Sequence, residues 1–469
     1  MHNQSRRNFL KSLGMAGAVL PLAARLACRL ENHSKPNIIF IMADDLGYAD
    51  LGCYGSKAIQ TPRIDRLAAE GMKFTQFYSG CCVCAPARCT LMTGKHTGHA
   101  TVRGNTGGIP LPDSEITIAE LLRKAGYATG GFGKWGLGDL DTAGVPEKQG
   151  FDEFFGYYHQ IHAHSYFPEY LIHNGKKVIL TGNKEKSGTQ FSHHLIVEKM
   201  LDFIRRNQER PFFCYAPWTP PHGLWHIPDD EPAWQRYKDE SWSHKARVIA
   251  AMIYMIDHDV GQVLDLLDEL GLADNTLVFF CSDNGADSRF EGSLDSSGIL
   301  RGKKRDLYEG GIRSPMIVRW HGKIAPGVTS SLPWYFPDVL PTVTELCGAE
   351  VSLPEDIDGH SVAPTLLNRG EQKMHEALYW EFPLYDWQQK RYDPNRLMQA
   401  ARSGDWKLLR HRQDQPWELY HLADDPGETN NLAQIHPQII GRIVEWISRN
   451  RVEQPPQAEP EMPAGRKFR

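Results

Sequence analysis

The segment around residue 84 concentrates side chains that can do nucleophilic chemistry. Residues 81–95 read CCVCAPARCTLMTGK, so four of the nine cysteines of the chain fall within residues 81–89, together with Arg88. A cysteine in its thiolate form is both a nucleophile and a metal ligand. Zinc sites made of cysteines usually combine two Cys-x-x-Cys pairs, and residues 81–89 offer no second pair. The segment therefore indicates local chemistry, or simply small buried side chains, rather than a zinc site.

Oxygen-bearing side chains follow two apolar runs that have the composition of buried strands. Asp44 and Asp45 follow residues 37–42, and Asp283 and Asn284 follow residues 276–281. Three carboxylates and an amide oxygen form a ligand set that suits Ca²⁺ or Mg²⁺. Aspartate and asparagine are also common in ordinary turns after strands, so the alternative to a metal site is a pair of turns.

Two basic side chains occupy similar places. Lys134 follows the apolar run at residues 127–132, and His222 lies a few residues after the run at residues 212–216. Ligands of open α/β sheets bind at the carboxyl ends of the strands. We therefore expect Lys134 and His222 to lie near the oxygen-bearing side chains, where their chemistry complements a metal site.

Strands alternate with helices over most of the chain. Residues 117–125 are predicted to form a helix, with Thr117 as N-cap and Glu120 as its capping-box partner. Residues 246–269 have the pattern of a long amphipathic helix. This alternation predicts an α/β fold with a large, mostly parallel sheet flanked by helices.

The sequence pattern changes beyond about residue 370. Short runs at residues 378–382, 400–402 and 406–409 predict antiparallel strands, and residues 439–449 predict a closing helix. Three parts follow from this change: a main domain over residues 36–370, a C-terminal α+β subdomain over residues 371–450, and a flexible tail over residues 451–469.

The composition is that of an ordinary globular protein with an unusual N-terminus. The 469 residues are 41% hydrophobic, and a formal net charge of −5 gives no basic field for nucleic acid. Arg6 and Arg7 precede the weakly apolar residues 13–24, a stretch too short to span a membrane. This pattern predicts a signal peptide over residues 1–30 that the twin-arginine export machinery reads, and hence a periplasmic or secreted protein. A basic amphipathic helix is the alternative.

The pattern Cys-x-Pro-x-Arg at Cys84, followed by Leu-x-Thr-Gly-Lys at residues 91–95, resembles the signature of the type I sulfatases. Further blocks of the chain resemble this family in the same order, at residues 133–138, 217–222, 300–315 and 417–432. The resemblance covers about residues 36–450. It implies a sulfuric ester hydrolase with an alkaline phosphatase-like fold.

The resemblance also implies the nucleophile and the metal. In this family the cysteine, here Cys84, is oxidised to Cα-formylglycine by a formylglycine-generating enzyme. One hydroxyl of the aldehyde hydrate attacks sulfur and the other later expels sulfate, which divides one difficult step into two. The implied ligands of Ca²⁺, with Mg²⁺ as the alternative, are Asp44, Asp45, Asp283, Asn284 and the modified Cys84.

An anion pocket is implied as well. Lys134, Lys304 and His222 would bind sulfate, and His222 would be the general acid. Arg88 would lie beside the nucleophile, where a fixed guanidinium suits concentrated negative charge. The register of the block at residues 300–315 selects Lys304, although a solvated basic run is the alternative.

The chain departs from the family pattern at Gly136, where the family usually has a histidine that serves the hydrate. His162 and His164 are candidates to fill the vacated space. Either histidine could instead contact substrate or be structural.

Taken together, the sequence predicts an exported sulfatase that hydrolyses sulfate monoesters, with sulfated carbohydrates as the expected substrates. Several aromatic side chains could stack on sugar rings or simply pack in the core: Trp218, Trp225, Trp234, Trp242, Trp387, Tyr166, Tyr170 and Tyr385. One alternative is a phosphodiesterase or phosphonate monoester hydrolase of the same fold, because phosphate and sulfate esters share geometry. The other is a non-catalytic binder of sulfated glycans, which the missing histidine at Gly136 would suit.

Overall fold

The structure is a computed structural model of the 469-residue chain. It describes residues 35–107, 109–288, 293–348, 351–386, 388–389 and 391–453, without the side chain of Pro394. The predicted signal peptide over residues 1–30, and residues 454–469 of the predicted tail, lie outside the described residues. Within the described ranges, no helix has both the length and the apolar character that a membrane span requires.

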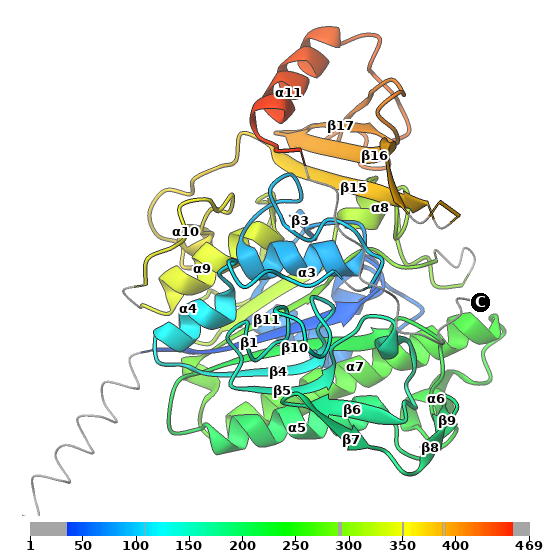
Figure 1. Cartoon of the computed structure of the whole chain (residues 1–469), viewed down its shortest axis with the longest axis vertical. Helices are drawn as coiled ribbons and strands as arrows, with labels where there is room; N and C mark the ends of the chain where they lie inside the picture. Colours follow the sequence, from blue (N-terminus) through cyan, green and yellow to red (C-terminus); the bar gives the residue numbers. More distant parts are fainter. Residues whose placement is uncertain are drawn as a thin grey trace, which may run out of the picture.

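A ten-stranded sheet with the order β13-β2-β12-β11-β1-β10-β4-β5-β6-β7 forms the centre of the molecule (Figure 1). Its central strands are parallel: β11 (Thr276–Ser282), β1 (Asn37–Asp44), β10 (Phe212–Pro221), β4 (Ala128–Lys134) and β5 (Glu153–Tyr157). Strands toward the two edges include antiparallel pairs: β12 (Met316–Trp320), β2 (Met72–Phe74), β13 (Val328–Ser330), β6 (Tyr170–His173) and β7 (Lys176–Ile179). The prediction of a large, mostly parallel sheet is confirmed.

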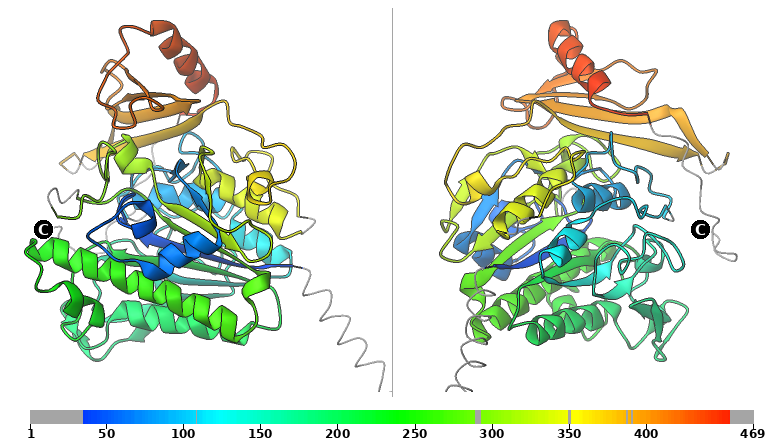
Figure 2. Two further views of the ribbon diagram at one scale, coloured as in Figure 1. Left: turned by 180° about the vertical axis from the view of Figure 1, so that it is seen from behind. Right: turned by 60° about the vertical axis from the view of Figure 1, so that its left-hand side comes forward.

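Alternate side chains of β1 point to opposite faces of the sheet and enter different apolar cores. Ile38 and Phe40 belong to one core, and Ile39 and Ile41 belong to the other. The first face is covered by α3 (Cys84–Thr93), α4 (Ile118–Lys124) and α9 (Val339–Leu346). The second is covered by α2 (Pro62–Glu70), α5 (Ser192–Arg206), α6 (Pro232–Tyr237) and α7 (His244–Glu269), as the views in Figure 2 show. Burial on both faces explains why β1 reads as an unbroken apolar run.

The starts of α4 and α7 follow local capping chemistry. Thr117 Oγ1 accepts the Glu120 N–H at 3.2 Å, and the Glu120 carboxylate accepts the Thr117 N–H at 2.9 Å, so the predicted capping box of α4 is present. Ser243 caps α7 by accepting the Ala246 N–H at 3.2 Å. These bonds satisfy N–H groups that lack partners inside the helix.

The C-terminal subdomain is a four-stranded antiparallel sheet with one helix. Its elements are β15 (Leu378–Asp386), β16 (Arg391–Ser403), β17 (Trp406–Arg410), β18 (Glu418–His421) and α11 (Pro437–Arg449). Trp380 and Ala400 face the main core, whereas Ala401 and Leu408 face α11. The predicted small antiparallel sheet plus helix is confirmed. Arg451, at the start of the predicted tail, still binds the Glu381 carboxylate at 2.8 Å.

Short elements complete the described chain and connect the larger ones. They are η1 (Gly52–Tyr54), β3 (Phe77–Tyr78), η2 (His162–His164), β8 (Asn183–Lys184), β9 (Ser187–Gly188), η3 (Ala273–Asn275), α8 (Glu309–Ile312), β14 (Trp334–Tyr335), η4 (Phe336–Asp338) and α10 (Ala363–Leu366). Of these, η2 and α8 carry residues that matter for the site.

Candidate active site

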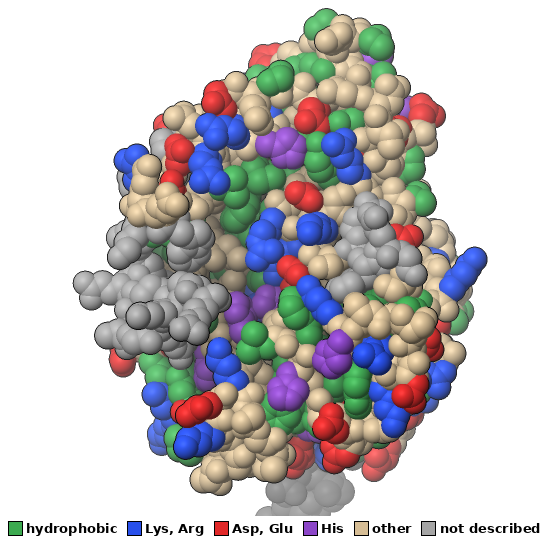
Figure 3. Space-filling view, turned by 90° about the vertical axis from the view of Figure 1, so that its right-hand side faces the viewer, with side chains coloured by type: hydrophobic (Ala, Val, Ile, Leu, Met, Phe, Trp, Pro, Cys, Tyr) green, Lys and Arg blue, Asp and Glu red, His purple; other side chains and the backbone are tan. Residues whose placement is uncertain are grey.

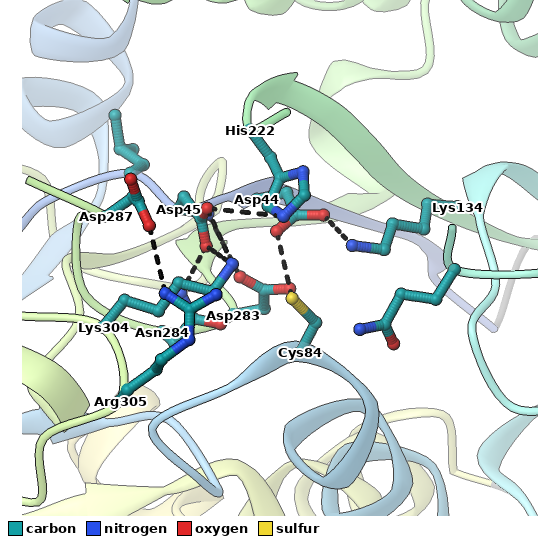
Figure 4. A network of polar contacts seen from close by, with 12 residues as sticks. Asp44, Asp45, Cys84, Lys134, His222, Asp283, Asn284, Asp287, Lys304 and Arg305 are labelled. Carbon is teal, nitrogen blue, oxygen red and sulfur yellow. Dashed lines mark hydrogen bonds and ion pairs between the residues drawn. The ribbon is translucent and has the colours of Figure 1, made fainter. Parts of the chain in front are cut away.

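Polar side chains gather at the carboxyl ends of the central strands (Figure 4). Asp44 ends β1, Lys134 ends β4, His222 follows β10 and Asp283 follows β11. Since β1 lies between β10 and β11, and β4 lies beside β10, the parallel order brings these strand ends to one edge. The edge opens to the face in Figure 3, which is hollowed, with histidine side chains in the hollow and lysine or arginine side chains beside it.

Helix α3 presents Cys84 to this edge. Cys84 is the first residue of the helix, and Pro86 lies in the first turn, where a missing N–H removes no helical hydrogen bond. The Cys84 Sγ lies 3.4 Å from Asp44 Oδ1 and has no exposed surface. Burial, followed by the charge of Asp44, raises the pKa of the Cys84 thiol to about 12. The unmodified thiol is therefore protonated near neutral pH, and a protonated thiol is a poor nucleophile.

Asp44 and Asp45 face different lysines. The Lys134 Nζ donates to Asp44 Oδ2 at 2.6 Å, and the Lys304 Nζ lies 2.6 Å from Asp45 Oδ1. Burial by itself raises the pKa of Asp44, but the surrounding cations, Lys134 foremost, hold that pKa well below its ordinary value. At Asp45 burial prevails and raises the pKa to about 7.

The guanidinium of Arg88 connects three strand ends, those of β1, β4 and β11. Its Nη2 lies 2.8 Å from Asp283 Oδ2 and 3.3 Å from Asp44 Oδ2, and its Nη1 donates to the carbonyl oxygen of Lys134. Arg88 has no exposed surface. Burial opposes its charge, yet the carboxylates of Asp283 and Asp44 raise the pKa of Arg88 above its ordinary value. A rigid, planar fork of donors fixes both carboxylates in place.

The amide of Asn284 indicates a missing ligand. Its Nδ2 donates to Asp45 Oδ1 at 2.7 Å and to the Gly285 carbonyl at 2.9 Å. A carbonyl only accepts, so Gly285 fixes the amide orientation and leaves Asn284 Oδ1 buried without a hydrogen-bond partner among the described residues. Four side chains place one ligand atom each within 4.8 Å of the others: Asp44, Asp45, Cys84 and His222. An orphaned oxygen beside carboxylates fits a hard divalent cation such as Ca²⁺ or Mg²⁺.

His222 and His164 form a pair of aromatic rings beside the cluster. Their centroids are 4.7 Å apart, and His222 Nε2 lies 3.6 Å from Asp45 Oδ2. The Nδ1 of His222 is buried and has no hydrogen-bond partner within the described part of the chain. Burial, assisted by Lys304, lowers the pKa of His222 well below its ordinary value, and burial lowers the pKa of His164 to about 3. A bound anion would offset these effects and favour the protonated imidazole.

Comparison with known proteins identifies the family. The family model described as Sulfatase matches residues 36–349, and a model described as N-sulphoglucosamine sulphohydrolase, C-terminal, matches residues 302–450. The chain belongs to the sulfatase family. The resemblance drawn from the motif at Cys84 is thus confirmed, and so is the assignment to the sulfuric ester hydrolases.

Relatives of this sulfatase match it along most of its length. Arylsulfatase A of Homo sapiens is 32% identical over an alignment of 471 positions, gaps included. The alignment covers 89% of this chain and 87% of that protein. N-acetylgalactosamine-6-sulfatase of Rattus norvegicus is 33% identical over 439 residues, covering 84% and 80%. The solved structure of Ps i-CgsB in complex with k-i-k-neocarrahexaose has a TM-score of 0.77 and 28% identity, covering 89% of this chain and 94% of that chain. The predicted alkaline phosphatase-like fold is confirmed.

The two candidate histidines of this sulfatase lie in different surroundings. The ring of His162 packs against Tyr170, with centroids 4.4 Å apart, and against Tyr157 at 5.1 Å. The ring of His164 contacts His222 instead. The η2 turn thus brings His164 to the cluster and packs His162 among tyrosines.

Gln160, which was not predicted as a site residue, lies beside Gly136. A Cβ at Gly136 would lie 3.6 Å from Arg88 Cδ and 3.6 Å from Gln160 Oε1. Asn105 Oδ1 accepts the Ala85 N–H at 3.1 Å and the Gln160 Nε2 at 2.7 Å. Because Ala85 fixes the oxygen of Asn105, Gln160 must turn its Nε2 toward it, and Gln160 Oε1 stays buried without a partner in the described structure. No residue pattern in the sequence marks this amide pair.

Two expectations about sugar stacking need correction. Trp218 and Tyr166 are 0% and 2% exposed and pack in the core, because the strand and loop that carry them lie under α5 and α7, whereas Trp225 is partly exposed. A hollow of about 1180 Å³ lies elsewhere, with Met72, Val328 and Arg369 in its wall. No residue of the cluster lines it, so volume alone does not identify the active site of this sulfatase.

Proposed function

We propose that this sulfatase is exported and hydrolyses sulfate monoesters on carbohydrates, with Cα-formylglycine made from Cys84 as nucleophile and Ca²⁺ as the metal. The observation that carries the proposal is the placement of Cys84. Its Sγ lies 3.4 Å from Asp44, in a group of buried oxygen-bearing side chains that includes an orphaned amide oxygen and that pairs with two buried lysines. Burial and the charge of Asp44 raise the pKa of the unmodified Cys84 thiol to about 12, which disfavours the thiolate form in the metal-free site.

The residues divide into metal ligands and anion ligands. Asp44, Asp45 and the modified Cys84, whose ligand atoms lie close together, would hold the cation. Asp283 and Asn284, which hydrogen-bond to Asp45, would complete the set. The cation would polarise the sulfate oxygens and lower the pKa of the aldehyde hydrate. The hydrate would supply one hydroxyl for attack on sulfur and a second for the release of sulfate.

The remaining basic side chains would bind and orient the sulfate group. With a cation on the carboxylates, the Lys134 and Lys304 ammonium groups, now paired with Asp44 and Asp45, become available to sulfate oxygens. His222 would protonate the leaving oxygen, and its Nδ1, which has no hydrogen-bond partner among the described residues, supports this role. Arg88 keeps two carboxylates oriented.

Carbohydrate substrates are supported by the relatives. One of them is named N-acetylgalactosamine-6-sulfatase, and a similar solved structure holds k-i-k-neocarrahexaose. Export rests on Arg6 and Arg7 and agrees with a substrate taken from outside the cell. Replacing both arginines by lysine should leave the protein in the cytoplasm, which fractionation of the cells would measure.

The nucleophile and the reaction can be tested together. We expect peptide mass spectrometry of protein made with a formylglycine-generating enzyme to find an aldehyde at Cys84, and aryl sulfate to be hydrolysed faster than aryl phosphate. Faster turnover of aryl phosphate would instead favour the phosphodiesterase or phosphonate monoester hydrolase. An intact thiol in every preparation, together with no turnover, would favour a glycan-binding protein.

A further inference from the structure

A second group of charged side chains lies at the mouth of the site, outside the buried cluster. It consists of Arg305, Asp287, Lys245 and the ring of Trp225. Figure 4 shows Asp287 and Arg305 beside Lys304, on the side of the cluster opposite Lys134. One backbone hydrogen bond fixes this placement. The Lys304 N–H donates to the Ala286 carbonyl at 2.9 Å, and these two residues directly precede Arg305 and Asp287.

The mouth group has more positive than negative charge. Asp287 is shared by two cations: its Oδ1 lies 3.3 Å from Arg305 Nη1, and its Oδ2 lies 3.2 Å from Lys245 Nζ. The Lys245 ammonium also lies 3.4 Å from the centroid of the Trp225 ring. The Arg305 side chain is 63% exposed, so the pairing with Asp287 adds little to stability. An exposed guanidinium that uses one donor on a shared carboxylate keeps further N–H groups for another anion.

The backbone holds Arg305 in a conformation that arginine rarely adopts. Its φ is 76°, in the left-handed region that favours glycine, and Trp225 on the other side of the mouth has a φ of 44°. The Arg305 N–H donates to the Cys82 carbonyl at 3.0 Å, which ties the residue to the segment that carries Cys84. Left-handed backbone at a non-glycine residue is one form of strain that functional sites contain, and Asp45 of the cluster, with a φ of 66°, is another instance.

We propose that Arg305, with the positive charge of Lys245 nearby, forms a binding site for a second anionic group of the substrate, a sulfate or a carboxylate on the sugar that carries the scissile sulfate or on its neighbour. This inference rests on the proposed function and narrows the substrate class to glycans with more than one negative charge. The planar fork of Arg305 suits the oxygens of a carboxylate or a sulfate. Asp287 holds both cations in one group when no substrate is bound.

Arg305→Gly is the sharpest variant, because glycine adopts the left-handed backbone without strain. We expect it to melt at the same or a higher temperature than the parent protein. We also expect its kcat/KM to fall about tenfold for a disulfated disaccharide and to stay within about twofold for a singly charged aryl sulfate. The matched control is Lys303→Ala, which removes an exposed cation from the same loop and should change neither value.

Further probes separate the two sources of the second charge. A disaccharide with two sulfates and one with a single sulfate plus a uronic acid are compared with a monosulfated, otherwise neutral disaccharide. A preference for both charged probes identifies a general anion site, and a preference for one identifies its ligand. Higher salt should reduce the preference, since exposed charges are screened.

Two results would overturn the inference. One is an equal loss of kcat/KM for every substrate in Arg305→Gly, which would mean that Arg305 only supports Lys304. The other is an unchanged preference for the disulfated probe. If no sulfate ester is hydrolysed at all, the proposed function fails, and calorimetric titration of the disulfated and monosulfated disaccharides into the parent protein and Arg305→Gly still decides the site. Equal dissociation constants for the two proteins would then exclude it.

Discussion

Two clusters of buried charge in the described part of this sulfatase can be compared, the active-site cluster and the contact between the main domain and the C-terminal subdomain. At the contact, Lys407 Nζ lies 2.9 Å from Glu309 Oε1 and 3.0 Å from Glu428 Oε1, and none of these side chains has exposed surface. The Tyr78 hydroxyl donates to Glu309 Oε2 at 2.7 Å, and the Glu309 N–H donates to Glu428 Oε2 at 2.7 Å. Glu428 Oε1 has no hydrogen-bond partner among the described residues, so the positive charge of Lys407 stabilises it.

Hydrogen bonding is less complete in the active-site cluster. Its carboxylates also face bases, but Asn284 Oδ1, His222 Nδ1 and Gln160 Oε1 are buried without hydrogen-bond partners among the described residues. Each such atom costs roughly 1–3 kcal/mol of stability. The interdomain network therefore serves stability, whereas the site gives up stability to leave atoms available for ligands.

One segment supplies both networks. Lys304 reaches Asp45 in the site, and Glu309, at the start of α8, reaches Lys407 of β17. The docking of the C-terminal subdomain thus fixes the loop that carries Lys304. Variants in the two networks should separate activity from stability.

The largest effect is expected for Cys84→Ala. Loss of the nucleophile should lower the hydrolysis of aryl sulfate by about 10⁴-fold or more. The free energy of unfolding should change by only about 1 kcal/mol, because the thiol is small and makes a single weak contact. Initial rates and urea unfolding measure the two quantities. Cys89→Ala, a buried position in the same helix, is the control and should keep its activity; full turnover in Cys84→Ala would exclude Cys84 as the nucleophile.

Lys407→Met should show the opposite behaviour. Removing the base leaves Glu309 and Glu428 buried without it, which should cost about 3–5 kcal/mol in the free energy of unfolding. Activity per folded molecule should fall much less than in Cys84→Ala. Urea unfolding followed by circular dichroism checks the loss, and Lys176→Met on the exposed strand β7 is the control. A Lys407→Met protein as stable as the parent would mean that the interdomain network does not stabilise the fold.

The next prediction is that Ca²⁺ stabilises the protein through the active-site cluster and not through the interdomain network. At about one hundred times its dissociation constant, Ca²⁺ should raise the free energy of unfolding by about 3 kcal/mol. The increase should persist in Lys407→Met and shrink in Asn284→Leu, which removes the orphaned oxygen. Thermal melting with Ca²⁺, with Mg²⁺ and with a chelator measures it. An equal increase in Asn284→Leu would place the metal elsewhere.

The two histidines of η2 provide the next comparison. His164→Ala should lower the rate by more than about tenfold, equivalent to about 1.4 kcal/mol of barrier, because its ring contacts His222. His162→Ala should change the rate by less than about threefold and act mainly on stability, since its ring packs on Tyr157 and Tyr170. Rates over a range of pH and thermal melting check both. A larger rate loss in His162→Ala would reverse the assignment.

The sequence predicts those parts of the fold and of the site that depend on local residue patterns. The apolar run of β1 predicts a strand buried on both faces, and Asp44 directly after it predicts a side chain at the carboxyl end of the sheet. No pattern decides between His162 and His164, because a short 3₁₀ turn has no apolar face to orient it. Trp218 looked available for a sugar because its burial depends on helices far away in the chain.

The smallest effect is expected at Gln160, whose role depends on bonds between distant segments. Gln160→Leu keeps the size of the side chain and removes the orphaned acceptor, so the rate should fall by roughly three- to tenfold while the free energy of unfolding stays equal or rises. Gln160→Glu retains a carbonyl-type acceptor but loses the donor to Asn105, and it should be less stable than Gln160→Leu. Unfolding titrations and aryl sulfate kinetics compare the three proteins. If Gln160→Leu lost stability but kept its full rate, Gln160 would support the fold and have no part in the reaction.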